Sequence, residues 1–292
     1  MSKRGFYILD VFAEEKYSGN QLGVVCDSAG LSSEQMQEIA KEMNYSETTF
    51  ILSGQKEDSG YDVRIFTPNE EVPFAGHPTL GTAYIIRNEI QDGLADEIIL
   101  NLKVGQIPVT FDSSSDVLWM RTLEPVFGEC FDIGEIAEVL SISKDDIDKR
   151  FPVQSVSTGL GFIIVPLRNL EAVKNVEINK SKLFEFVSKT EAKLIFVFCG
   201  ETYNEDNDIN SRMFADAYGI AEDAATGSAN SCLAGYLVKH HYFGGGKIDV
   251  RVEQGYEIGR PSLLYLRAEE KDGKIDVSVG GKVAMVAKGE LI

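Results

Sequence analysis

Histidine, cysteine and tryptophan are scarce in this sequence. Three histidines, four cysteines and one tryptophan occur among 292 residues. The cysteines contain no Cys-x-x-Cys pair, and with so few histidines they form no zinc-binding signature. Four scattered cysteines in a chain of this length are typical of reduced thiols, which predicts a cytoplasmic protein. The four positions are Cys26, Cys130, Cys199 and Cys232.

Long apolar runs and an excess of basic residues are also missing. The longest apolar run, LIFVFC at 194–199, is far shorter than the ~20 residues of a membrane helix. The N-terminal run FYIL ends at Asp10, too early for the core of a signal peptide. Lys and Arg number 28 against 46 Asp and Glu, a formal net charge of -18. That charge argues against nucleic acid or an anionic membrane as a partner.

Short β-rich segments dominate what is present. Their β-branched and aromatic residues, bounded by turn residues, predict strands. The predicted strands are 5–12, 22–26, 48–52, 61–67, 97–102, 107–111, 162–167, 193–198, 211–215, 247–252, 262–268 and 274–279. Helices are predicted at 134–140 and 181–187, and an amphipathic one follows Ser32, which fits a capping box with Gln35. Its apolar face consists of Met36, Ile39, Ala40 and Met43.

Two further segments, 77–88 and 228–240, also indicate helices but carry small or apolar residues nearly all round. A helix without a polar face is usually buried. Each half of the chain is therefore expected to wrap its strands around one central helix.

The two halves share a local pattern, VRIFTPNEEVPFAGHPTLGTAYII at 63–86 and SRMFADAYGIAEDAATGSANSCLAGYL at 211–237. Each copy has Arg-x-Phe on a strand, an acidic loop, a glycine and then the buried helix. Such an internal repeat predicts two similar domains, although chance similarity between β-rich segments is the alternative. A cleft between two such domains is a common place for a small molecule.

Both of these helices begin at a glycine, Gly76-His77 in one half and Gly227-Ser228 in the other. A helix N-terminus offers unpaired N–H groups and a partial positive charge, and glycine lets a ligand approach the backbone. Each start is suited to a carboxylate or a developing enolate oxygen. One such motif alone is more often an ordinary capped helix, but its presence in both halves favours binding.

Two acidic residues accompany these motifs. Glu47, in NYSETTFIL, lies between a polar turn and an apolar strand, where a carboxylate suits general acid/base catalysis. The alternative is a solvent-facing strand glutamate. Asp223, in EDAATGSAN, either caps the second helix or binds a substrate amine.

Five stretches together carry a resemblance to a known family. They are DVFAEEKYSGNQLGVV (10–25), MNYSETTFIL (43–52), RIFTPNEEVPFAGHPTLGTA (64–83), RMFADAYGIAEDAATGSA (212–229) and QGYEIGRPSL (254–263). In this order they resemble the phenazine-biosynthesis isomerase (PhzF-like) family, which has the diaminopimelate-epimerase fold. The resemblance implies an α+β fold of two pseudo-symmetric domains, each a curved, barrel-like mixed β-sheet around a central helix. The domains expected are 1–125 with 280–292, and 126–279.

The resemblance also implies the site and its chemistry. It gives Glu47, His77 and Asp223 catalytic roles and makes Gly76, Gly227 and Ser228 substrate-binding residues. It further implies a site without cofactor or metal, a homodimer, and a small substrate such as trans-2,3-dihydro-3-hydroxyanthranilate. The chain departs from many family members at Asp216 and Ala224, where they have proline.

Epimerases of this fold use two cysteines, and the corresponding positions here are Ala75 and Thr226. A two-thiol mechanism is therefore not expected. The preferred hypothesis is a cofactor-independent isomerase in which Glu47 moves the proton. The alternatives are a non-catalytic ligand-binding protein on the same scaffold and a single-base epimerase or racemase.

Overall fold

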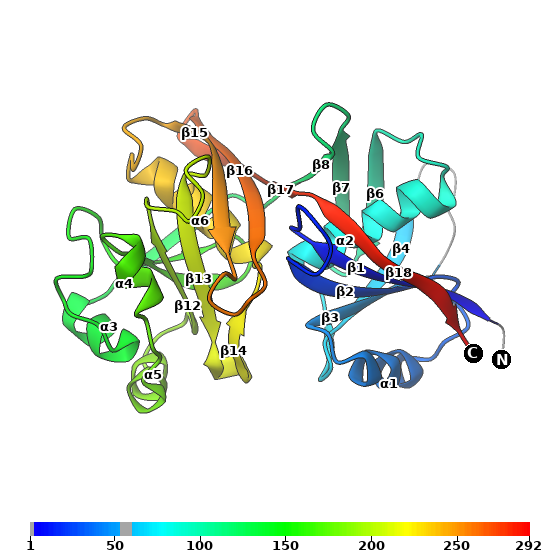
Figure 1. Cartoon of the computed structure of the whole chain (residues 1–292), viewed down its shortest axis with the longest axis horizontal. Helices are drawn as coiled ribbons and strands as arrows, with labels where there is room; N and C mark the ends of the chain where they lie inside the picture. The colour runs from blue at the N-terminus through cyan, green and yellow to red at the C-terminus, as the bar shows by residue number, and fades with distance from the viewer. Residues whose placement is uncertain (1–2, 53–59) are drawn as a thin grey trace. The chain divides into compact units, whose positions relative to one another are not determined.

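The computed structural model describes residues 3–52 and 60–292. The chain forms two compact units. Unit 1 consists of Met1–Arg121 with Gly280–Ile292, and unit 2 is Thr122–Val279. Figure 1 draws their helices and strands, and each unit is described by itself.

Unit 1 is a mixed sheet around one helix, α2 (Gly76–Ile85). Its strands are β1 (Arg4–Val11), β2 (Asn20–Val25), β3 (Glu47–Ile51), β4 (Tyr61–Phe66), β5 (Glu71–Val72), β6 (Glu97–Leu102), β7 (Gly105–Asp112), β8 (Val117–Arg121) and β18 (Val283–Leu291). β1 pairs antiparallel with both β18 and β2, whereas β2 and β3 run parallel. Helix α1 (Ser33–Met43) covers Phe50 and Phe66 with Met36 and Ala40, and the predicted Ser32–Gln35 capping box is present.

The central helix of unit 1 is buried because small residues let it approach the sheet. A Cβ on Gly81 would lie 2.5 Å from Leu22 Cδ2 and 2.9 Å from Val11 Cγ2. The next residue, Thr82, donates a hydrogen bond of 2.8 Å to Thr49 Oγ1 on β3. The predicted helix at 77–88 is therefore confirmed, but its α-helical part ends at Ile85. The chain continues as a π-helical segment, η1 (Ile86–Ile90).

Unit 2 repeats the plan around α6 (Gly227–Lys239). Its strands are β9 (Val126–Cys130), β10 (Gln154–Ser157), β11 (Gly161–Pro166), β12 (Leu194–Cys199), β13 (Ile209–Ala215), β14 (Ile220–Asp223), β15 (Lys247–Gln254), β16 (Ser262–Lys271) and β17 (Lys274–Gly281), the last of which runs on into unit 1. Its other helices are α3 (Ile133–Leu140), α4 (Leu170–Lys174), α5 (Lys180–Val187) and the short 3₁₀-helix η2 (Asp216–Tyr218). Residues of α3, α4 and α5 share an apolar core with β11 and β12.

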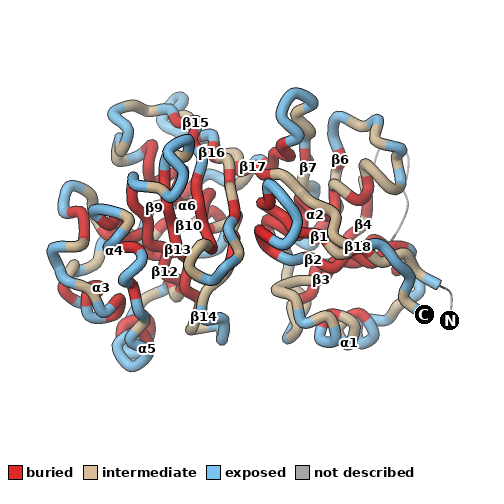
Figure 2. Tube along the Cα trace, in the orientation of Figure 1, coloured by how far each residue is buried: buried red, intermediate tan, exposed pale blue. Residues whose placement is uncertain are grey.

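The α+β prediction is confirmed, because each unit combines a mixed sheet with one buried helix. In Figure 2 the strands and central helices are largely buried, whereas the connecting loops are mostly exposed. Among the described residues, no helix has the length and apolar character needed to cross a membrane.

The repeated Arg-x-Phe motif makes an ion pair in unit 1. Arg64 on β4 donates two hydrogen bonds to Glu71 on β5, at 2.8 Å from Nε and 2.7 Å from Nη2. Its guanidinium lies 5.0 Å from the centre of the Phe66 ring. The pair fixes the hairpin that precedes the start of α2.

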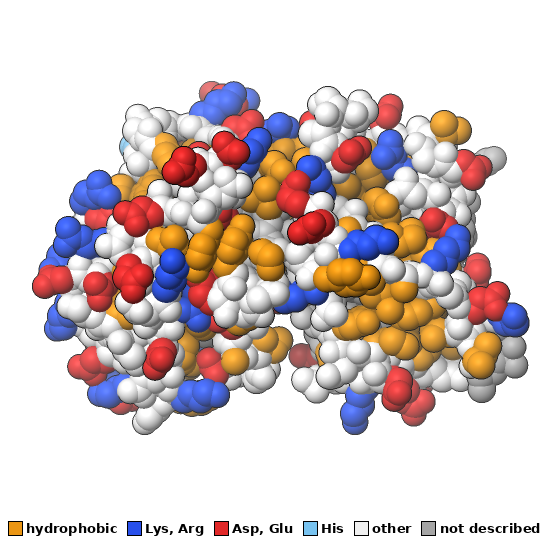
Figure 3. Space-filling model, in the orientation of Figure 1, with side chains coloured by type: hydrophobic (Ala, Val, Ile, Leu, Met, Phe, Trp, Pro, Cys, Tyr) orange, Lys and Arg blue, Asp and Glu red, His pale blue; other side chains and the backbone are white. Residues whose placement is uncertain are grey.

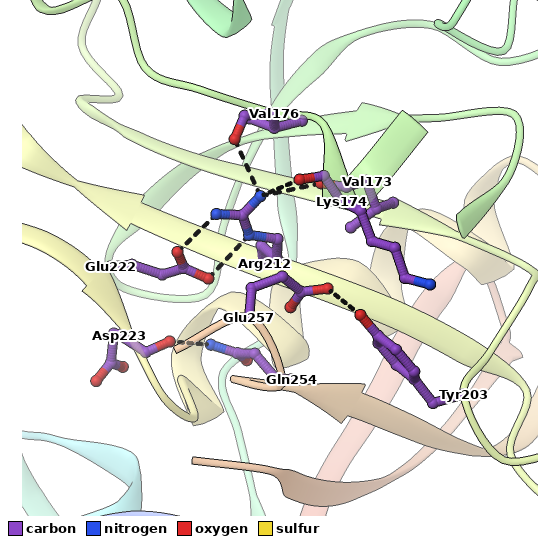
Figure 4. Close-up of polar contacts among 9 residues, drawn as sticks. All are labelled: Val173, Lys174, Val176, Tyr203, Arg212, Glu222, Asp223, Gln254 and Glu257. Carbon is purple, nitrogen blue, oxygen red and sulfur yellow. Dashed lines mark hydrogen bonds and ion pairs between the residues drawn. The ribbon is translucent and has the colours of Figure 1, made fainter. Parts of the chain in front are cut away.

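The second copy makes the same contacts in unit 2. Arg212 on β13 binds Glu222 on β14 at 2.9 Å from Nε and 2.8 Å from Nη2, and it stacks 4.8 Å from the centre of the Phe214 ring. Arg212 Nη1 also donates to the carbonyls of Val173 and Val176, both at 3.0 Å (Figure 4). The repeat seen in the sequence therefore corresponds to a shared local structure before each central helix.

Candidate functional site

Glu47 is the first residue of β3, and the parallel pairing with β2 places it opposite Leu22. Its side chain is 18% exposed, so the alternative of a solvent-facing glutamate does not hold. Residues two apart on a strand share a face. Thr49 on that face bonds to Thr82 of α2, so Glu47 lies on the side of the sheet that carries the helix.

His77 is the second residue of α2 and is 5% exposed. Its Nε2 lies 3.3 Å from Glu47 Oε2. Burial lowers the pKa of His77 to about 3, and a hydrogen bond to the backbone of Gln21 opposes this only in part. At neutral pH the contact therefore joins a neutral imidazole to a carboxyl group.

No side chain caps the N-terminus of α2. The N-cap residue is Ala75, which has no polar side chain, and Pro78 has no N–H to satisfy. The amides of Gly76 and His77 are in the first turn, where N–H groups lack partners within the helix. Donors of this kind, beside the Glu47–His77 contact, suit an anionic group of a ligand.

The turn before Glu47 is held by a residue that the sequence did not single out. Asn20, 4% exposed at the start of β2, accepts a hydrogen bond of 3.4 Å from the Ser46 hydroxyl. Gly19 before it has a φ of +64°, and a Cβ there would lie 2.4 Å from the carbonyl oxygen of Val11. The Gly-Asn pair within the stretch 10–25 was the available signal.

In unit 2, Asp223 is the last residue of β14, and Gly227 and Ser228 are the first two residues of α6. The N-cap is Thr226, whose side chain makes no capping bond. Its hydroxyl instead donates a short hydrogen bond to Asp223 Oδ2. The turn thus holds a carboxylate close to an uncapped helix N-terminus.

Gln254, at the end of β15, lies under this turn and is fully buried. Its Nε2 donates a 2.9 Å hydrogen bond to the carbonyl of Asp223, as Figure 4 shows. Sequence reasoning missed this residue as part of the site, because Gln254 precedes a turn and resembles an ordinary strand end. The only signal was its place at the start of the stretch 254–263.

The structure therefore brings the predicted residues together in two groups. Glu47, His77 and Gly76 are neighbours in unit 1. Asp223, Gly227 and Ser228 are neighbours in unit 2, around Thr226.

Neither central helix begins at a cysteine. The N-cap positions of α2 and α6 are Ala75 and Thr226, so neither carries a thiol. Burial raises the pKa of Cys232 on α6 to about 12, which makes it a poor nucleophile. Residues 3–52 and 60–292 contain no group of three or more His, Cys, Asp or Glu that could hold a metal ion.

Charge on the surface is mixed. On the face drawn in Figure 3, acidic and basic side chains are interspersed. With a net charge of -18, an anionic ligand would depend on local donors such as the two helix N-termini.

Comparison with known proteins gives consistent matches over the whole chain. The model of the PhzC-PhzF family, described as phenazine biosynthesis-like protein, matches residues 9–289. A trans-2,3-dihydro-3-hydroxyanthranilate isomerase from Pseudomonas aeruginosa is 34% identical over 288 residues, covering 97% of this chain and 98% of that protein. The crystal structure of a PhzF-family phenazine biosynthesis protein from Bacillus anthracis has a TM-score of 0.89 at 27% identity and covers 100% of both chains. A predicted epimerase from Pseudomonas aeruginosa has a TM-score of 0.79 at 31% identity, covering 100% of this chain and 99% of that one.

Proposed function

This chain belongs to the PhzC-PhzF family of phenazine biosynthesis-like proteins and is an isomerase, and from that premise we propose that Glu47 is its general acid/base. The reaction is a proton shift, without a cofactor, on a small metabolite that carries a carboxylate. Trans-2,3-dihydro-3-hydroxyanthranilate, the compound in the name of the Pseudomonas aeruginosa relative, or a close analogue is the proposed substrate.

The observation that carries this proposal is the 3.3 Å contact between Glu47 Oε2 and His77 Nε2. A general acid/base must both accept and release a proton during turnover. It works best when a neighbouring group holds its side chain in place. The ring N–H of neutral His77 is used by the Gln21 backbone, so Nε2 can only accept and is suited to hold Glu47 in its protonated form, which can return a proton to the substrate. This supports proton transfer by Glu47 and a positioning or relay role for His77.

The proposed step moves one proton and one double bond. The Glu47 carboxylate accepts a proton from a substrate carbon next to a double bond, and the electron pair of that C–H bond moves into the conjugated system. The protonated Glu47 then returns the proton to a different carbon, so that substrate and product are isomers and the enzyme is restored.

The helix N-termini supply the proposed anchors. The amides of Gly76 and His77 in unit 1, and of Gly227 and Ser228 in unit 2, are suited to a carboxylate or to charge that develops during proton removal. Asp223 is suited to an amine on the substrate, because an ionised carboxylate only accepts hydrogen bonds.

The test is a Glu47→Gln variant, which keeps the size of the side chain but cannot exchange a proton as an acid/base. We expect turnover to fall at least ~10²–10⁴-fold, with the thermal midpoint and ligand affinity nearly unchanged. In deuterated water the wild type should introduce deuterium into the product and the variant should not. Glu42→Gln, at an exposed position on α1, is the matched control and should behave as the wild type. Activity retained in Glu47→Gln would remove this residue from the mechanism.

A single-base epimerase is the second candidate, favoured by the predicted epimerase that aligns with this chain at 31% identity. It would also depend on Glu47, so the variant alone does not separate the two. Nuclear magnetic resonance of the product does, because an isomerase moves a double bond whereas an epimerase inverts one carbon. Binding with no hydrogen exchange in the wild type would instead indicate the non-catalytic alternative.

We also propose that the protein works in the cytoplasm as a homodimer. The four cysteines are all free, which supports a reducing compartment. Light scattering on the purified chain would test the dimer directly.

A further inference from the structure

Gln254 makes four hydrogen bonds to residues in and beside the turn between β14 and α6. Its Nε2 donates to the Asp223 carbonyl at 2.9 Å and to Thr226 Oγ1 at 3.1 Å. Its Oε1 accepts from the Thr226 amide at 3.2 Å and from Asn230 Nδ2 at 2.9 Å. A backbone carbonyl can only accept and a backbone amide can only donate, so the orientation of the Gln254 amide is fixed.

This orientation fixes the Thr226 hydroxyl in turn. Thr226 Oγ1 accepts from Gln254, so its own proton is available for one other partner, and that partner is Asp223 Oδ2. The bonds therefore run in one direction, from the Gln254 amide through the Thr226 hydroxyl to the Asp223 carboxylate. Bonds arranged in this way polarise one another, and Asp223 Oδ2 is the acceptor at the end of the series.

The backbone holds Gln254 firmly in place. It pairs with Ser262 on β16 and with Ser211 on β13. The next residue, Gly255, has a φ of +77°, and a Cβ there would lie 2.5 Å from the carbonyl oxygen of Ala224. The end of β15 is thus packed directly against the turn. An ordinary strand end does not require such close packing.

We propose that Gln254 is a positioning residue that acts through the Thr226 hydroxyl to hold the Asp223 carboxylate in one orientation for an amine on the substrate. The inference rests on the proposed role of Asp223. It adds Gln254, a residue that does not touch the substrate. It also adds a feature of the substrate, an amino group, which this part of unit 2 selects.

Ligand binding tests this apart from turnover. The probes are 2-aminocyclohexanecarboxylate, which carries an amine beside its carboxylate, and cyclohexanecarboxylate, which lacks the amine. Isothermal calorimetry would measure both against the wild type and the Gln254→Met, Thr226→Val and Thr226→Ser variants. Thr158→Val is the matched control. It removes another buried hydroxyl, which contacts Ser231 of α6 and not Asp223.

We expect Gln254→Met and Thr226→Val each to weaken binding of the amino acid by about tenfold or more, the size of a lost hydrogen bond to a charged group. Binding of cyclohexanecarboxylate should not change. Thr226→Ser should restore wild-type affinity, and Thr158→Val should leave both ligands unaffected. The double variant of Gln254→Met and Thr226→Val should be no weaker than the poorer single variant, because both act on the same bond.

Equal losses for both probes would overturn the proposal, since they would indicate general damage to the turn. If Gln254→Met does not fold, the Thr226→Val and Thr226→Ser pair decides: equal affinity in those two variants overturns the proposal, and loss in the valine variant alone supports it. If the wild type binds neither probe, the proposed substrate class is wrong and this inference fails with it. Wild-type binding of both probes with the same affinity would refute only the role of Asp223 and Gln254.

Discussion

Replacing His77 by glutamine should change how the stability of unit 1 depends on pH. His77 is buried, and burial lowers its pKa from 6.5 to about 3. Between pH 6.5 and about 3, His77 is protonated in the unfolded chain but not in the folded chain. Stability is therefore fully present above pH 6.5 and is lost as the pH falls toward 3.

The size of the effect follows from the shift. Each pH unit below the unfolded pKa costs about 1.4 kcal/mol of unfolding free energy. Between neutral pH and pH 5, the wild type should thus lose about 2 kcal/mol through His77 alone. The His77→Gln variant has no group to titrate there, so its loss over the same range should be smaller by about 2 kcal/mol.

Urea unfolding, followed by tryptophan fluorescence at several pH values, would measure this. The single tryptophan, Trp119, lies on β8 within unit 1 and is 9% exposed, so it reports on the unit that contains His77. His241→Gln is the control, because His241 is exposed and lies in unit 2. Parallel stability curves for the wild type and His77→Gln would refute the reasoning, because they would mean that folding does not change proton binding at His77.

Two other changes in unit 1 have expected outcomes. Gly81→Ala should lower the unfolding free energy by about 1–3 kcal/mol, because the new methyl group would overlap Leu22 and Val11, and thermal denaturation would detect the loss. Glu71→Gln should cost about 2–3 kcal/mol at neutral pH, because the hydrogen bonds from Arg64 hold the pKa of Glu71 at about 2 instead of 4.5. That stability is present above pH 4.5 and is lost as the pH falls to 2, so the two proteins should become equally stable near pH 2.

Features set by neighbours in the chain were predictable from the sequence. The capping box at Ser32 depends on residues three apart, and it is present as predicted. The two central helices were predicted from the small and apolar residues around them, and both are buried. The continuation of α2 as η1 was not predicted, because a π-helical segment leaves the apolar pattern of a helix unchanged.

Features set by pairing between distant segments were not predictable in the same way. β14 has four residues and includes Glu222 and Asp223, which as a sequence resemble a loop. The contact between Glu47 and His77 depends on how α2 packs on β3, and sequence spacing does not specify it. Gln254 contacts Thr226 only because β15 pairs beside β13, so its role depends on strand register.

The pairing of β1 with β18 bears on how the protein is made. Arg4 lies opposite Leu291, so β1 gains this partner only after the whole of unit 2 has been synthesised. Unit 2 is one continuous stretch of chain and can complete its sheet earlier. Until residues 283–291 emerge, one edge of β1 lacks its partner, and an open strand edge favours aggregation. The nascent chain therefore carries an open edge on β1 throughout the synthesis of unit 2.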